Sequence, residues 1–175
     1  MALHIIIDGY NLIRQSSTLS LIDQEDLQLG REALIDMLAA YKKIKAHKIT
    51  VVFDAAYSDA VSQQTENIKG IRVVFSRQGE LADTVIKRMA EKERERALVV
   101  SSDHEILNTV ESSGASTISS VAFEYRISMA SYMTQKGMQS LEEEDAGWQP
   151  TTKKKGPRRK KSKRERKQKV KIRKL

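Results

Sequence analysis

Residues 3–13, with the sequence LHIIIDGYNLI, limit the possible folds more than any other part of the chain. They begin with residues 4–7, a short run dominated by β-branched side chains, which is typical of a strand buried on both faces of a parallel sheet. Asp8 follows this run directly. Ligands of open α/β sheets bind beyond the carboxyl ends of the strands, so the sequence predicts that Asp8 faces a crevice.

Four further segments have the pattern of buried strands, and amphipathic segments separate them. The predicted strands are 49–53, 71–75, 97–100 and 115–118, and the predicted helices are 27–48, 80–94, 106–113 and 120–134. Residues 13–24 are expected to form a polar connection, residues 55–70 a loop, and Asp23 or Asp26 the cap of the first helix. Because strand–helix–strand units cross over the sheet, this order predicts an α/β fold with a mainly parallel sheet between helices.

Composition excludes several kinds of site. The chain has no cysteine, which rules out disulfides, thiolate metal sites and cysteine nucleophiles, and its three histidines disfavour a histidine-rich zinc site. Its length of 175 residues suits one well-buried domain. The sequence has no signal-peptide pattern and no apolar run of membrane-spanning length, so we expect a cytoplasmic protein with no membrane contact.

The net charge of +8 is divided unevenly along the chain. Residues 153–175 contain 15 Lys and Arg and a single Glu, whereas residues 1–152 contain 16 basic and 22 acidic side chains. We therefore expect a folded domain over residues 1–138, an acidic linker over 139–152 and a basic tail over 153–175. Like charges repel and little apolar surface is available to bury, so the tail is predicted to be disordered.

Carboxylates follow the predicted strands at one end of the sheet. Asp8, Asp54 and Asp103 each come directly after a strand or its polar extension, and Glu80 and Asp83 open a helix. If these strands are neighbours, the acids converge on one cleft and repel one another, and a divalent cation would relieve that repulsion. Oxygen ligands favour Mg²⁺ or Mn²⁺ over Zn²⁺, and such an ion activates water for cleavage of a phosphodiester.

Each of these acids, taken singly, also suits a structural role. Aspartate after a strand often caps a helix or forms a turn, as Asp103 would for the helix that follows it, and Glu80 and Asp83 are favourable in a first helical turn. Structural roles do not readily explain four acidic positions at the same edge. Asp83 is better placed than Glu80, because the apolar stripe of its helix must face the core.

Polar residues beside the acids are candidates for holding water or phosphate. Gly9 permits a sharp turn next to the cleft, and Asn11 can orient a water molecule or a phosphate oxygen. Ser101 and Ser102 can hold Asp103 or contact the scissile phosphate. The alternative is that Gly9 and Asn11 form a local turn and that the serines merely start a helix.

Four segments, in this order and at these intervals, resemble the NYN domains of the PIN-like nuclease superfamily, and most closely the bacterial YacP-like branch. They are IIIDGYNLI, VVFDA, GELADTVIKRMA and LVVSSDHEI, and the resemblance covers about residues 2–135. It implies a PIN-like three-layer α/β/α sandwich with a metal-dependent ribonuclease site. Asp8, Asp83 and Asp103 match the acidic metal-binding positions, Asn11 the polar residue of the first motif, and Asp54 the acid after the second strand. The branch is associated with ribosomes and cleavage of messenger RNA, which makes the ribosome an expected partner.

The basic tail has no aromatic side chain for stacking on bases, so it is expected to bind RNA phosphates without reading sequence. Its candidate RNA-contacting residues are Lys153, Lys154, Lys155, Arg158 and Arg159. A solvated tail without a partner is the alternative.

For the whole chain, the first hypothesis is a metal-dependent endoribonuclease in which Asp8, Asp54, Asp83 and Asp103 bind the ion and Asn11 and Ser102 position phosphate or water. The others are a non-catalytic ribosome- or RNA-binding factor and a phosphatase or flap-type DNA nuclease.

Overall fold

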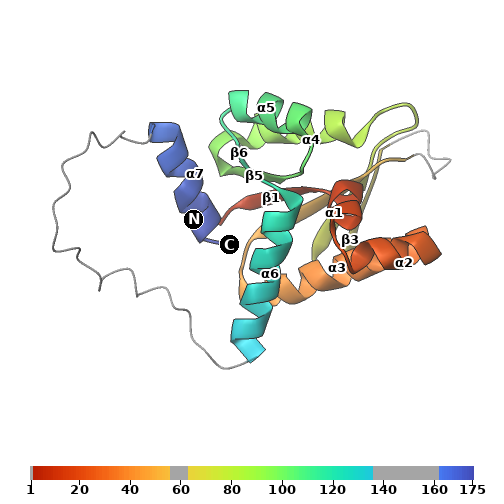
Figure 1. Cartoon of the computed structure of the whole chain (residues 1–175). Helices are drawn as coiled ribbons and strands as arrows, with labels where there is room; N and C mark the ends of the chain where they lie inside the picture. Colours follow the sequence, from red (N-terminus) through yellow and green to blue (C-terminus); the bar gives the residue numbers. More distant parts are fainter. Residues whose placement is uncertain (1, 56–62, 136–161) are drawn as a thin grey trace.

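The structure is a computed structural model of the chain and describes residues 2–55, 63–135 and 162–175. Within these residues, six strands form one sheet in the order β3-β4-β2-β1-β5-β6 (Figure 1). The strands are β1 (His4–Asp8), β2 (Lys48–Phe53), β3 (Gln64–Ile68), β4 (Ile71–Phe75), β5 (Ala97–Val100) and β6 (Ser116–Ile118). All neighbouring strands are parallel except β3 and β4. The predicted α/β/α fold with a mainly parallel sheet is confirmed.

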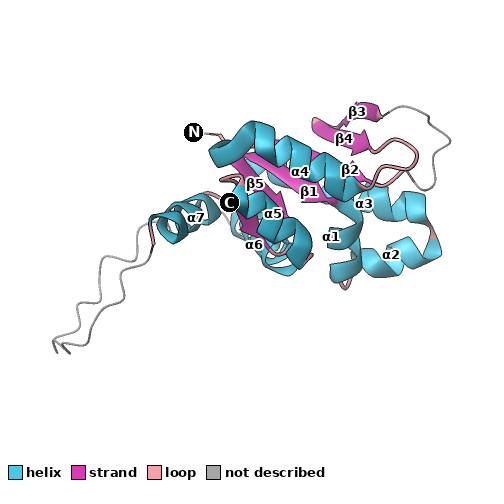
Figure 2. Ribbon diagram, turned by 90° about the horizontal axis from the view of Figure 1, so that it is seen from above, coloured by secondary structure: helices cyan, strands magenta, loops and turns pink. Residues whose placement is uncertain are grey.

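Helices cover both faces of this sheet, so its central strands have no solvent-exposed face (Figure 2). The helices are α1 (Gly9–Gln15), α2 (Leu19–Glu25), α3 (Leu27–Ile44), α4 (Ala82–Glu93), α5 (His104–Ser112), α6 (Ser120–Gln135) and α7 (Lys163–Arg173), with a short 3₁₀ turn at Arg94–Arg96. Alternate residues of β1 point to opposite faces: Ile5 and Ile7 enter the core beneath α1, α3 and α6, and Ile6 enters the core beneath α4 and α5. Among the described residues, no helix has both the length and the apolar content needed to cross a membrane.

The register of the three central strands brings their carboxyl ends to one edge. Ile7 pairs with Val100 across β1 and β5, so Asp8 and Ser101 are the next residues at this edge. Asp8 pairs with Val52 across β1 and β2, and Asp54 follows two positions later. The predicted convergence of strand ends therefore follows from the hydrogen-bonding pattern of the sheet.

The predicted polar connection over residues 13–24 is wrong, because most of the segment is helical. Asp8 accepts a hydrogen bond from the backbone nitrogen of Asn11 and caps α1, so the chain passes directly from strand to helix. In α2, the side chain of Leu19 is buried in the hydrophobic core and anchors this helix to the domain. Asp26 caps α3 through the backbone nitrogens of Gln28 and Leu29, as predicted for one of the two candidate caps.

The predicted loop over residues 55–70 contains an additional strand, β3. Its side chains are mostly exposed, so the sequence has none of the apolar alternation that identifies a half-buried strand. Lys69 and Gly70 both have positive φ, which suits a two-residue turn into β4. Backbone pairing with β4, and not side-chain burial, therefore defines this edge strand. Residues 56–62 lie outside the described residues.

The predicted disorder of the basic tail is wrong for residues 162–175, which contain helix α7. Ser162 and Glu165 form a reciprocal capping box: the Ser162 hydroxyl accepts from the Glu165 nitrogen at 3.1 Å, and the Glu165 carboxylate accepts from the Ser162 nitrogen at 2.7 Å. A serine followed three residues later by a glutamate is a sequence signature of a helix start. The high positive charge of the surrounding residues favoured a prediction of disorder instead. The predicted boundary at residue 138, the linker over 139–152 and residues 153–161 lie outside the described residues.

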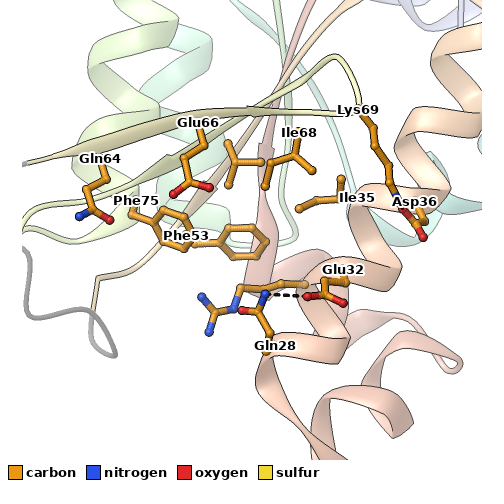
Figure 3. A pocket seen from close by; sticks show the side chains of 12 residues that line it. Gln28, Glu32, Ile35, Asp36, Phe53, Gln64, Glu66, Ile68, Lys69 and Phe75 are labelled. Carbon is orange, nitrogen blue, oxygen red and sulfur yellow. Dashed lines mark hydrogen bonds and ion pairs between the residues drawn. The ribbon is translucent and has the colours of Figure 1, made fainter.

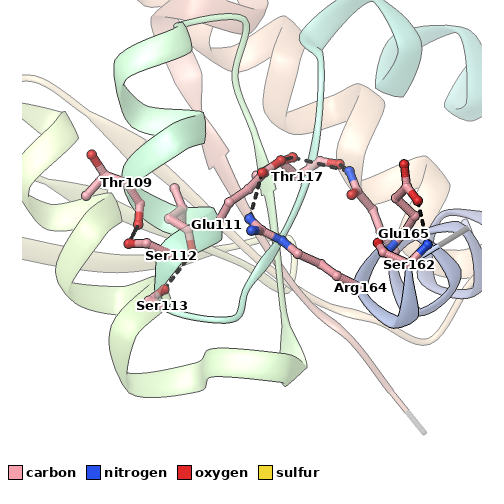
Figure 4. Close-up of polar contacts among 10 residues, drawn as sticks. Thr109, Glu111, Ser112, Ser113, Thr117, Ser162, Arg164 and Glu165 are labelled. Atoms are coloured by element: carbon pink, nitrogen blue, oxygen red, sulfur yellow. Dashed lines mark hydrogen bonds and ion pairs between the residues drawn. The ribbon is translucent and has the colours of Figure 1, made fainter.

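Helix α7 packs beside β6 and pairs with acidic groups of the folded body (Figure 4). Arg164 contacts the Glu111 carboxylate at 2.7 Å, and the Gln168 side chain donates to the Thr117 carbonyl at 3.0 Å. Lys167 contacts Glu95 at 2.6 Å. Beyond the helix, Leu175 is buried in the core beneath α3 and α6. Charge complementarity and two apolar contacts, buried Leu175 and partly buried Ile172, therefore hold the helix against the domain.

The anchor of α7 can be tested at Tyr41, whose buried hydroxyl donates to the Leu175 carbonyl at 2.9 Å. We predict that Tyr41→Phe lowers the free energy of unfolding by about 1 kcal/mol, because one buried hydrogen bond is lost and a carbonyl is left without its donor. Amide hydrogen exchange in α7 should accelerate by more than the global change. Tyr125→Phe, at a tyrosine that is 66% exposed, is the matched control and should change neither quantity. Equal exchange rates in the two variants would contradict the docking of α7.

Candidate functional site

The candidate site lies at the edge where β2, β1 and β5 end side by side. Asp8 is the last residue of the central strand and is 9% exposed. Asp54 and Asp103 lie just beyond the ends of the flanking strands, and Asp83 comes from the first turn of α4. The structure thus brings together the four carboxylates that the sequence places after strands and at the start of the second predicted helix.

Burial dominates the electrostatics of Asp8. Its pKa is raised to about 6, chiefly by desolvation and further by the nearby charges of Asp83 and Asp54. Two hydrogen bonds oppose this shift: Asp8 Oδ1 accepts from the Asn11 nitrogen at 3.1 Å, and Oδ2 accepts from the Ser101 hydroxyl at 3.3 Å. The carboxylate is therefore held in place by these hydrogen bonds, and no basic side chain among the described residues forms an ion pair with it.

Ser101 links two of the acidic positions. Its buried hydroxyl donates to Asp8 and accepts from the backbone nitrogen of Asp103 at 3.1 Å. Asp103 Oδ1 accepts from the Glu105 nitrogen at 2.7 Å and so caps α5. The structural alternative for Asp103 is thus realised, while its second carboxylate oxygen makes no hydrogen bond within the described residues.

Asp54 performs a similar role at α4. Its Oδ1 accepts from the backbone nitrogen of Ala82 at 2.5 Å, which holds the start of the helix against the end of β2. This contact brings Asp83, the next residue, toward the strand ends. Burial raises the pKa of Asp83; the nearby Lys87 lowers it, and the charges of Asp103 and Asp54 raise it further. The charges of Asp54, Asp83 and Asp103 therefore act on neighbouring carboxylates of the cluster.

Lys87 is a component of the site that sequence reasoning missed. It lies one turn after Asp83 on α4 and forms an ion pair with Glu105 at 2.8 Å. Its charge also acts on Asp83 and is influenced by Asp103. The four-residue spacing from Asp83 was the available signal, because residues at that spacing share one face of a helix. A cation thus borders the cluster of acids.

Asn11 connects three segments that border the site. Its amide oxygen accepts from the Ser102 backbone nitrogen at 2.8 Å and from the Ser120 hydroxyl at 2.7 Å. The Ser102 hydroxyl in turn accepts from the Ser120 nitrogen at 3.2 Å. Ser120, which the sequence did not single out, thereby ties α6 to α1 and to Ser102 beyond the end of β5. The oxygen of Asn11 is occupied within the protein, whereas its amide nitrogen makes no hydrogen bond to any described residue.

Glu80 takes no part in this cluster. Its carboxylate pairs with Arg88 at 2.9 Å and with Arg77 at 3.4 Å. These two arginines neutralise the charge that made Glu80 a candidate. The predicted RNA-contacting residues of the tail lie outside the described residues, namely Lys153, Lys154, Lys155, Arg158 and Arg159.

The donor set suits a hard divalent cation, although the side chains do not form a preassembled cage. The cluster offers carboxylate oxygens and amide or hydroxyl groups, which Mg²⁺ and Mn²⁺ prefer. The raised pKa values of Asp8 and Asp83 are the electrostatic condition that a cation would relieve. However, within the described residues, no three His, Cys, Asp or Glu side chains are grouped closely enough to hold one ion. Binding would have to draw the carboxylates together.

Comparison with known proteins assigns the chain to a family. The family model described as "YacP-like NYN domain" matches residues 5–174. A curated relative, the "Uncharacterized protein YacP" of Bacillus subtilis (strain 168), is 28% identical over 87 residues, which are 50% of this chain and 51% of the relative. The match therefore spans about half the length of that relative.

Two crystal structures of Rae1 (YacP) from Bacillus subtilis resemble the chain in fold. The structure of a mutant form has a TM-score of 0.65 and 22% identity, covering 77% of this chain and 80% of the other. A second structure has a TM-score of 0.63 and 23% identity, covering 78% of this chain and 79% of the other. At these identities the likeness establishes a shared fold.

The cost of burying the Asp8 charge can be measured directly. A pKa of about 6 in the folded protein, against an ordinary value of 3.8, means that ionised Asp8 destabilises the fold at neutral pH. We predict that Asp8→Asn raises the free energy of unfolding at pH 7 by about 1–3 kcal/mol, because the amide keeps the shape and removes the charge. The gain should shrink as the pH falls from about 6 to about 4, where wild-type Asp8 becomes neutral. Urea unfolding at several pH values measures it, and a variant less stable than wild type at pH 7 contradicts it.

Proposed function

This chain belongs to the YacP-like NYN domain family, within the PIN-like nuclease superfamily, and on that premise we propose that it is a metal-dependent endoribonuclease. The proposed substrate is RNA, with messenger RNA engaged by the ribosome as the target. The observation that carries the proposal is the convergence of four carboxylates at the ends of β1, β2, β5 and the start of α4, with the pKa of Asp8 raised to about 6. Asp8, Asp54 and Asp103 each accept a hydrogen bond at a helix start, and Asp83 lies in a first helical turn, but these structural roles do not require four carboxylates at one edge of the sheet.

Asp8 and Asp83 are the proposed principal ligands of Mg²⁺ or Mn²⁺, with Asp103 and Asp54 completing the site through the oxygens that do not cap helices. Such an ion, when bound, lowers the pKa of water and stabilises the negative charge that develops on a phosphodiester. The role of the protein is to hold the carboxylates at fixed positions. Ser101 and the backbone of Asn11 do this for Asp8.

Other groups at this edge are proposed to position the RNA. The Asn11 amide nitrogen and the exposed side of Ser102 are available to a phosphate oxygen or an attacking water. Lys87 lies beside Asp83 and supplies positive charge where a phosphate would approach. Its ammonium group would exchange the exposed Glu105 carboxylate for the phosphate, and this exchange costs little because surface ion pairs are weak.

The basic residues of the C-terminal region are proposed to attract RNA to an otherwise acidic body. Residues 153–175 hold 15 of the 31 Lys and Arg of the chain. In α7, Arg164 and Lys167 are engaged with the body, whereas Arg166 and Lys169 are exposed and appear in no ion pair of the described residues. These cations, with Lys153, Lys154, Lys155, Arg158 and Arg159, would bind phosphates in a salt-dependent manner.

A second candidate function is a non-catalytic factor that binds RNA or the ribosome. The observation that favours it is the capping of α4 by Asp54 and of α5 by Asp103, together with the lack of a preassembled three-ligand group among the described residues. In this case the basic residues would be needed and the acids would not. The two functions differ in whether RNA is cut.

Cleavage assays distinguish these candidates. We predict that the purified chain cuts single-stranded RNA with Mn²⁺ or Mg²⁺, and that Asp8→Asn or Asp83→Asn lowers the rate at least about a hundredfold, because each removes a ligand charge. Glu91→Gln, an exposed carboxylate on the same helix as Asp83, is the matched control and should retain full activity. Ribosome-bound messenger RNA should be tested beside free RNA. DNA of the same sequence tests the alternative of a DNA nuclease.

If Asp8→Asn cuts RNA as fast as wild type, the nuclease site lies elsewhere. If wild type binds RNA without cutting it in either form, and the acid variants bind equally well, the non-catalytic factor is the better description. Replacing the five basic residues of 153–159 by glutamine should weaken RNA binding without disturbing α7, which starts at Lys163.

Metal binding is a separate prediction. Isothermal titration of Mn²⁺ into the full chain should show binding that Asp83→Asn weakens at least about tenfold, since one coordinating charge is lost. The full chain is required because Leu175 is part of the core, so truncation before α7 would disturb the fold. Glu91→Gln is again the control. Equal affinities for Mn²⁺ in wild type and Asp83→Asn would exclude Asp83 as a ligand.

A further inference from the structure

A cavity of about 440 Å³ lies on the other side of the β2 end from the acidic cluster. It is enclosed by α3 on one side and by β3 and β4 on the other (Figure 3). Phe53 lines the cavity, and Asp54, the next residue, contacts α4 on the opposite face of the sheet. One residue that lines the cavity, Phe53, and one of the acids, Asp54, are therefore consecutive residues at the end of β2.

The walls of this cavity follow from the two periodicities of secondary structure. Gln64, Glu66 and Ile68 are alternate residues of β3, so their side chains share one face of the strand. Gln28, Arg31 and Ile35 recur at three- and four-residue spacing on α3. A polar face of an edge strand is thus opposed to a mixed face of a helix, which leaves an open space between them.

Two aromatic rings and a guanidinium group line part of the cavity. The rings of Phe53 and Phe75 are stacked, with centroids 5.7 Å apart and planes inclined by 25°. The Arg31 guanidinium carbon lies 5.7 Å from the centroid of Phe75. Phe53 is fully buried, whereas Phe75 is partly exposed to the cavity. Aromatic rings and arginine planes of this kind are the surfaces on which proteins stack unpaired RNA bases.

Among the described residues that line the cavity, Glu66 is a carboxylate that remains available for hydrogen bonding. Glu32 accepts from Gln28 at 2.8 Å, and Asp36 is paired with Lys69. Glu66 points into the cavity and makes no hydrogen bond to another described residue (Figure 3). A carboxylate accepts hydrogen bonds and cannot donate them, so it suits the ring N–H and amino group on the pairing edge of guanine. Adenine presents a ring acceptor at that edge and would be repelled.

We propose that this cavity binds an unpaired guanine base of the RNA strand, flanking the phosphodiester held at the carboxylates. The inference rests on the proposed function, since it assigns the base contact of the same RNA substrate. Phe75 and Arg31 provide the stacking surfaces and Glu66 contacts the edge of the base. The cavity gives the protein a means of selecting where RNA is bound, which the basic residues of the C-terminal region cannot supply.

Binding of short RNAs to the full chain tests the proposal without cleavage. The probes are labelled heptamers of uridine whose central nucleotide is guanosine, adenosine or an abasic ribose, and the protein carries Asp103→Asn so that the RNA stays intact. Fluorescence anisotropy measures the affinities at moderate salt. The readout is the ratio of affinities for the guanosine and abasic probes, because contacts to phosphate cancel in this ratio.

The guanosine probe should bind about tenfold more tightly than the abasic probe, and Phe75→Leu should bring that ratio close to one. Arg31→Gln, on an accessible part of α3, should lower the ratio as well and serves if Phe75→Leu folds poorly. Glu66→Gln should remove the preference for guanosine over adenosine. Tyr125→Leu, at an exposed aromatic residue of α6, is the matched control and should leave every ratio unchanged.

The proposal is overturned if the Asp103→Asn protein binds the guanosine and abasic probes equally, or if neither Phe75→Leu nor Arg31→Gln, added to Asp103→Asn, changes the ratio. An unchanged preference for guanosine in Glu66→Gln removes Glu66 from the base contact and overturns the guanine assignment. Cleavage by wild type with equal binding of all probes would reject the cavity while retaining the nuclease. Base-dependent binding without cleavage would retain the cavity and reject the nuclease.

Discussion

The burial of an uncompensated carboxylate at the end of the central strand is the constraint on which the candidate site depends. Asp8 lies between two parallel neighbours, where covering helices exclude water and raise its pKa to about 6. Hydrogen bonds from the Asn11 nitrogen and Ser101 offset part of the cost. No basic side chain forms an ion pair with it among the described residues. Buried titratable groups with strongly shifted pKa values are typical of functional sites, because selection for stability alone would remove them.

The surroundings of Asp8 are organised by hydrogen bonds between polar residues from distant parts of the sequence. Asn11 and Ser120 join the first helix to the last helix of the folded body, and Ser101 joins Asp8 to the start of α5. Asp54 and Asp103 each hold a helix start with one oxygen. Helix capping by these acids is therefore compatible with the proposed metal binding, since a carboxylate that caps a helix through one oxygen has a second oxygen to offer.

Charge is distributed so that the body and the C-terminal region attract each other. The body carries the excess of acidic groups, and α7 meets it through Arg164 with Glu111 and Lys167 with Glu95. These pairs are exposed and individually weak, so the buried Leu175 and the hydroxyl of Tyr41 supply the more specific contacts. Docking thereby places the positive charge of α7 at one side of an acidic domain.

Local patterns in the sequence were sufficient for every described strand except β3 and for helices α3, α4, α5 and α6, because β-branched runs and helical spacing report directly on burial. Thus β1, β2, β4 and β5 lie where their apolar runs predict, and the carboxylates after them share one edge once the strands are parallel. Tertiary contacts alone decided the rest. Strand β3 has no apolar alternation and exists by pairing with β4, and α7 is stabilised by groups more than fifty residues away. The sequence by itself determined which residues can form a carboxylate site. The tertiary structure decided which partners hold them and where the cavity beside Phe53 and Phe75 opens, because those depend on contacts between segments that no local pattern encodes.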